Sequence, residues 1–103
     1  MIRHCVLIAL RSPEDRTAAL DAMETLAGLV GTIDGMVEFA HGPNRDFEGK
    51  SQRYDIGFMA TFADRAAHLR YEAHPVHVAA GATLVRCAAG RHDGIFVADI
   101  ETD

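Results

Sequence analysis

The stretch YEAHPVHV, residues 71–78, sets the number of helices in the second half of the chain. Pro75 has no amide hydrogen with which to continue a helix, and it forces the preceding residue, His74, into an extended conformation. A helix over residues 64–72 therefore has to end before the proline. Because proline is favoured in the first turn of a helix, we expect a second helix over residues 75–85.

Four segments have the composition of β-strands. In residues 54–62 large apolar side chains alternate with smaller or polar ones, which is the period of a strand. Residues 2–10 and 94–100 are apolar on both alternating faces, which predicts strands that are covered on both sides. The fourth strand is expected over residues 36–41, after a turn at residues 33–36.

The remaining regular element is a helix over residues 13–30. Ser12 is a typical N-cap, and Pro13 and the acids after it suit the first turn of a helix. Gly31 is a candidate C-cap. The side chains expected on the buried stripe of this helix are Leu20, Met23, Ala27 and Val30.

The predicted order is therefore β-α-β-β-α-α-β. This is the ferredoxin-like α+β plan, a four-stranded antiparallel sheet with its helices on one face. The chain of 103 residues is too short for two hydrophobic cores, so we expect a single domain over residues 1–103. The first and last strands also have apolar residues on the face that helices cannot cover. This predicts a homodimer whose sheets pack face to face.

Composition argues against several classes of function. The net charge is −5 and Lys50 is the only lysine, so we expect no nucleic-acid partner. No segment is long and apolar enough to cross a bilayer, and the apolar run 5–10 is too short for a signal peptide, so no membrane partner is expected. Cys5 and Cys87 match no metal or redox spacing, which is typical of reduced cysteines in a cytoplasmic protein.

The same elements carry motifs that resemble the stress-responsive A/B-barrel (Dabb) family. The likeness covers nearly the whole chain, and it implies a ferredoxin-like subunit that forms a dimeric α/β barrel, with a cavity between helices and sheet. The matching stretches are Met1-Ile2-Arg3-His4, Ile33-Asp34-Gly35-Met36, Phe62-Ala63-Asp64, Tyr71-x-x-His74-Pro75-x-His77 and Val97-Ala98-Asp99-Ile100.

One branch of that family, the plant polyketide cyclases, closes a ring by an aldol-type reaction with a histidine and a tyrosine. By motif position these residues resemble His77 and Tyr71, and His4 matches a strand histidine that lines the cavity in that branch. The same branch has a tyrosine on its first helix, where this chain has Leu26. The resemblance therefore implies that substrate placement differs here.

The residues themselves leave two interpretations open. His77 falls in the first turn of a helix, where the dipole disfavours the protonated ring, so it suits a general base, and the Tyr71 hydroxyl suits a donor to a carbonyl. Alternatively, Tyr71 packs into the core and His77 bonds a backbone carbonyl at the helix joint. His74 is expected to satisfy free backbone groups at the same joint.

We expect no metal and no cofactor. His74 and His77 do not share a helical face, and no further ligand stands at a suitable spacing from them. His41, His68 and His92 are given no role.

The sequence thus predicts a protein that binds a small hydrophobic or aromatic molecule in its cavity. The alternative is a cofactor-free acid–base enzyme, a cyclase, lyase or isomerase, with His77 as base, Tyr71 as donor and His4 as an auxiliary group. A third possibility is a cofactor-free oxygenase, known for related dimeric barrels.

Overall fold

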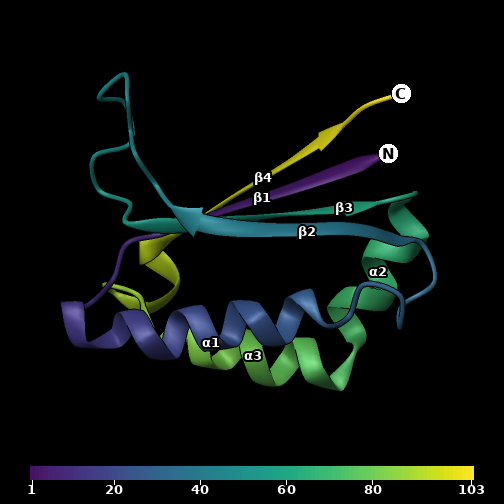
Figure 1. The fold of residues 1–103 in the computed structure, drawn as a ribbon, viewed down its shortest axis with the longest axis horizontal. Helices are drawn as coiled ribbons and strands as arrows, with labels where there is room; N and C mark the ends of the chain where they lie inside the picture. The colour runs from purple at the N-terminus through teal and green to yellow at the C-terminus, as the bar shows by residue number, and fades with distance from the viewer.

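Four strands and three α-helices follow one another in the predicted order in the computed structural model, which describes residues 1–103 (Figure 1). Two short 3-10 helices precede α1 and β4. The elements are β1 (Ile2–Ile8), η1 (Pro13–Asp15), α1 (Arg16–Ala27), β2 (Met36–Pro43), β3 (Ile56–Phe62), α2 (Arg65–Ala73), α3 (Pro75–Cys87), η2 (Arg91–Gly94) and β4 (Ile95–Glu101).

The strands form one sheet in the order β2-β3-β1-β4, and each neighbouring pair is antiparallel. In this register Val6 on β1 lies opposite Phe58 on β3 and Val97 on β4. All three α-helices lie on the same side of the sheet, where α1 and α3 run side by side (Figure 1). The ferredoxin-like α+β fold predicted from the sequence is confirmed.

The hydrophobic core lies between the sheet and the helices. On β1 and β3 every second side chain points into it, as the period of a strand requires. Helix α1 lies against β2, and α2 lies against β2 and β3, but no helix packs closely on β4. The space beneath β4 is therefore left to side chains of α3 and η2. The largest side chains sealed in the core are Tyr71, Phe62, Ile8, Met23, Leu26 and Ile56.

The first helix differs from its prediction. The α-helix ends at Ala27, and Gly31 has φ +87° in the loop beyond it instead of capping the helix. The fully buried positions are Ala19, Ala22, Met23 and Leu26. Of the predicted stripe, Met23 is buried, Leu20 and Ala27 are partly buried, and Val30 is exposed. Glycine at position 28 weakens the helix, and Leu29 and Ile33 in the turns that follow pack into the core.

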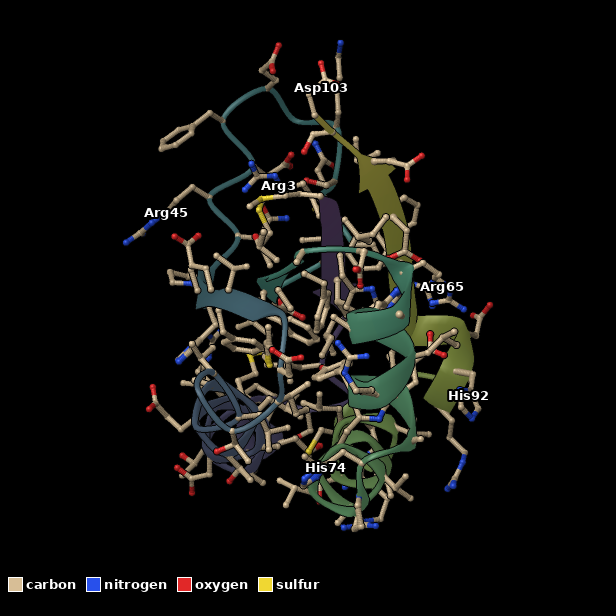
Figure 2. The ribbon with its side chains drawn as sticks, turned by 90° about the vertical axis from the view of Figure 1, so that its right-hand side faces the viewer. Arg3, Arg45, Arg65, His74, His92 and Asp103 are labelled. Carbon is tan, nitrogen blue, oxygen red and sulfur yellow. The ribbon has the colours of Figure 1, made fainter.

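The joint between α2 and α3 was predicted correctly. Asp64 caps α2, since its Oδ1 accepts a hydrogen bond from the Ala67 amide at 2.9 Å. His74 has extended backbone angles, φ −68° and ψ 133°, and its Nδ1 accepts a hydrogen bond from the Val76 amide at 3.1 Å. His74 is thus the N-cap of α3, and it lies at the joint of the two helices (Figure 2).

The face of the sheet away from the helices remains open. Met59, Phe96 and Ile100 lie on this face and are 42%, 47% and 53% exposed. No helix has both the length and the apolar character needed to span a membrane.

Candidate functional site

A cavity of about 750 Å³ lies between α3 and the strands β1 and β4. Its volume is in the usual range for small-molecule sites. The middle of its wall is mainly apolar, the end near α2 carries histidine, tyrosine and carboxylate side chains, and the end near η2 carries two arginines. The apolar wall includes Val6, Ile8, Phe58, Val85, Ile95 and Val97.

Helical and strand periodicity place the side chains on this wall. His77, Gly81 and Val85 are four residues apart on α3 and therefore share one face of the helix. On β4, Ile95, Val97 and Asp99 alternate with the residues of the open face. The cavity occupies the space under β4 that no helix fills.

His77 lies at the polar end, in the first turn of α3. Its Nδ1 is 3.0 Å from the Glu72 carbonyl oxygen, which only accepts, so Nδ1 carries the proton and Nε2 keeps its lone pair. Burial, followed by the nearby charges of His4 and His74, lowers the pKa of His77, although the Glu72 carbonyl partly offsets this. The ring is therefore a neutral base near pH 7.

Gly81 lies beside the free nitrogen of that ring. A Cβ atom at position 81 would be 3.9 Å from His77 Nε2 and would meet no other atom within 4 Å. A glycine inside a helix costs about 0.5–1 kcal/mol relative to alanine. Gly81 thus keeps space open in front of Nε2 at some expense of helix stability.

Tyr71 lines the cavity from α2, and its ring centroid is 4.3 Å from that of His77. The side chain is fully buried, and its hydroxyl has no hydrogen-bond partner in the protein. Burial, with the charge of Glu72, raises the pKa of Tyr71, so the hydroxyl stays protonated. The hydroxyl oxygen is also closed off from solvent, so a molecule in the cavity reaches it only if neighbouring side chains move.

His4 and Asp99 meet across β1 and β4, where the strand register makes them direct neighbours. His4 Nδ1 is 2.6 Å from Asp99 Oδ1, and the carboxylate only accepts, so this nitrogen donates. Asp99 thereby orients the ring. The His4 ring centroid is 6.0 Å from that of Tyr71.

His68 adds a third histidine to this end of the core. It lies on α2 with its ring centroid 4.7 Å from that of His4, and only 2% of it is exposed. Arg65 Nη1 is 2.7 Å from His68 Nδ1 and can only donate, so the neutral ring carries its proton on Nε2. Figure 2 shows Arg65 at the start of α2, close to β4.

His4, His68 and Asp99 bring three metal-ligand groups within 4.8 Å of one another, which the spacing along the sequence did not suggest. The Arg65 guanidinium opposes a metal here, because it places a positive charge beside His68. The contacts that the side chains make are two separate ones, His4 with Asp99 and His68 with Arg65.

The structure brings together the three residues singled out from the sequence, His77, Tyr71 and His4, at one end of the cavity. The packing interpretation agrees with the structure, since Tyr71 is buried in the core and His77 bonds a backbone carbonyl at the helix joint. Both side chains also line the cavity, and their acid–base role stays a prediction. Leu26 lies sealed in the core.

His68 was missed, although one signal for it was present. It precedes Tyr71 by three residues on a helix, and residues at this spacing share a face.

The protein has a four-stranded ferredoxin-like sheet with a cavity beneath its edge strand. These features are typical of small α+β barrel subunits. The family model described as the Stress Responsive A/B Barrel Domain matches residues 2–102. The chain belongs to this family.

Solved structures agree with this assignment. A dimeric ferredoxin-like protein of unknown function from Jannaschia sp. CCS1 is 42% identical, with 98% of each chain covered and a TM-score of 0.94. A Dabb family protein from Mesorhizobium loti is 29% identical, with 99% of this chain and 96% of that chain covered and a TM-score of 0.67. Hydroxynitrile lyase from Passiflora edulis is 14% identical, with 99% and 93% covered and a TM-score of 0.77, and it shares the fold. No protein among the curated ones matches the chain.

The buried histidines predict how stability depends on pH. Burial lowers the pKa of His68 and of His77 in the folded state, so below the ordinary histidine pKa of about 6.5 the unfolded chain binds more protons. The free energy of unfolding should therefore fall as pH is lowered from about 7 to 5. Each pKa unit of depression contributes about 1.4 kcal/mol.

Denaturant unfolding at a series of pH values from 8 to 5 measures the slope of the free energy of unfolding against pH. His68→Asn should flatten it, and adding His77→Gln should flatten it further, whatever the stability of the variants at pH 8. An unchanged slope in the double variant contradicts the assignment of these histidines.

Proposed function

We propose that this protein binds a small hydrophobic molecule in the cavity between α3 and the strands β1 and β4. The observation that carries the proposal is the cavity itself, with about 750 Å³ of space and an apolar wall that has polar side chains at both ends. Sites for small molecules usually combine a mainly apolar wall with a few convergent polar groups that orient the ligand.

Two features beyond the volume support binding. Val78 and Val97 line the cavity and are 58% and 49% exposed, so a ligand there would cover apolar surface that is now open to water. Each Å² of such surface that is removed from water contributes roughly 25 cal/mol. His77 Nε2, which borders the open space beside Gly81, gives the same ligand a hydrogen-bond acceptor.

Binding of Nile red, an uncharged fluorescent dye, tests the proposal. We expect saturable binding to the wild type and at least a tenfold loss of affinity, about 1.4 kcal/mol, in Gly81→Leu, whose side chain would fill the space beside His77. Gly81→Ala is the matched control. It should keep most of the affinity and raise the free energy of unfolding by about 0.5–1 kcal/mol.

Equal dye affinity in Gly81→Leu and in the wild type means that the dye binds elsewhere. Absence of saturable binding to the wild type contradicts the proposal directly.

We also propose that the chain forms a homodimer through the open face of its sheet. Met59, Phe96 and Ile100 expose apolar side chains there, and the Jannaschia relative, 42% identical over nearly the whole chain, is described as dimeric. Packing two such faces would remove these side chains from water.

Ile100→Asp places a charge on the proposed interface and should shift the protein to a monomer in light scattering across a dilution series. Val78→Asp, on a surface away from the open face, is the control and should leave the dimer intact. A wild type that is monomeric at all concentrations contradicts this part of the proposal.

A second candidate function is acid–base catalysis without a cofactor, in a cyclase, lyase or isomerase. The observation that favours it is the pairing of a neutral histidine with a protonated tyrosine whose hydroxyl is free. His77 Nε2 would accept a proton from a carbon next to a carbonyl, and Tyr71 would donate a hydrogen bond to the oxygen on which charge develops. A lyase exists on this fold, in the Passiflora protein.

This candidate predicts that the protein exchanges the protons next to the carbonyl of 2-decanone with deuterium from D₂O, as followed by NMR. His77→Ala and Tyr71→Phe should each lower the exchange rate about 10²-fold or more and leave Nile red binding in place. Exchange that is no faster than in buffer alone, or exchange in both variants that is as fast as in the wild type, argues for a protein that only binds.

A further inference from the structure

The end of the cavity opposite Tyr71 and His77 carries positive charge without a carboxylate partner. Arg86 lies in the last turn of α3, Arg91 lies at the start of η2, and both line the cavity. The only side-chain hydrogen bond of Arg86 goes to the Thr83 hydroxyl, at 3.1 Å, and the Arg91 side chain makes none.

The acids nearest in the fold are already engaged. Asp15 pairs with Arg11 at 3.1 Å, and Asp93 pairs with Arg53 at 3.0 Å. The chain as a whole has a net charge of −5. The two guanidinium groups without a carboxylate partner therefore make this end of the cavity positive in an otherwise negative protein. Guanidinium groups bind carboxylates through paired hydrogen bonds.

The two ends of the cavity are set apart by the length of α3. Arg86 follows His77 by nine residues, which corresponds to a rise of about 13 Å along the helix. On the opposite wall, β4 runs from Ile95, which follows η2, to Asp99 beside His4, again a distance of about 13 Å. An apolar stretch of this length separates the cationic end from the acid–base end.

We propose that the ligand of this cavity is an amphipathic carboxylate, whose apolar chain lies along α3 and β4 and whose carboxylate pairs with Arg86 and Arg91. The inference rests on the proposed function, binding in the same cavity, and adds the chemical class of the ligand and its orientation. The reverse orientation would bring the carboxylate next to Asp99 and Glu72, which line the other end. These two side chains would then repel the carboxylate of the ligand.

Displacement of Nile red by two ligands with the same chain, decanoate and 1-decanol, tests the inference at pH 8. In the wild type at low ionic strength we expect decanoate to bind at least threefold more tightly than decanol. Arg86→Gln and Arg91→Gln should each weaken decanoate about two- to fivefold, the usual size for an exposed ion pair, and about tenfold together. Decanol should bind all variants equally.

The control is Arg45→Gln, which also removes one exposed arginine. Arg45 lies in the loop between β2 and β3, on the other side of the molecule from His92 and η2 (Figure 2). It should leave both affinities unchanged. Adding 0.5 M salt should reduce the preference for decanoate in the wild type, because exposed charges are screened.

The outcomes separate the two proposals. If decanol displaces the dye but decanoate binds no better, or if the arginine variants bind decanoate as the wild type does, the carboxylate inference is overturned and the apolar cavity remains. If neither ligand displaces the dye, the proposed binding function fails as well. Both arginines are exposed, so loss of folding is not expected, and circular dichroism checks it.

Discussion

The break at Pro75 is the constraint on which the candidate site depends. It ends α2, and His74 in extended conformation starts α3 in a new direction with its own ring as the cap. Without the break, Tyr71 and His77 would be six residues apart on one continuous helix and would point to different sides of it. Because α3 turns, the two rings approach to 4.3 Å and both line the cavity.

The cavity also depends on an incomplete layer of helices. Helices α1 and α2 cover β2 and β3, but no helix packs closely on β4, and the cavity fills the remaining space. Gly81 widens it beside His77, and strand pairing brings Asp99 to His4 at the same end. The polar groups at this end therefore come from β1, α2, α3 and β4. Asp99 orients His4 and the Glu72 carbonyl orients His77, whereas the Tyr71 hydroxyl has no hydrogen-bond partner.

Local signals explain what could be predicted from the sequence. A proline break, strand alternation in residues 54–62 and a capping aspartate are properties of short segments, and all three predictions were correct. The end of α1 was not predicted correctly and its buried face only in part, because both depend on how the helix and the residues after it pack in the core. The His4–Asp99 contact joins residues 95 positions apart, so spacing along the chain carries little information about it. The His68–Arg65 contact, by contrast, is local to α2 and was overlooked.

The central claim is that the molecule recognised by this protein lies between α3 and β4. A titration of ¹⁵N-labelled protein with 1-decanol, followed by amide chemical shifts, tests it most directly. Our account predicts saturable shifts concentrated at Val78, Gly81 and Val97, which line the cavity. Shifts confined to Met59, Phe96 and Ile100 on the open face of the sheet, or no saturable shifts, would contradict it.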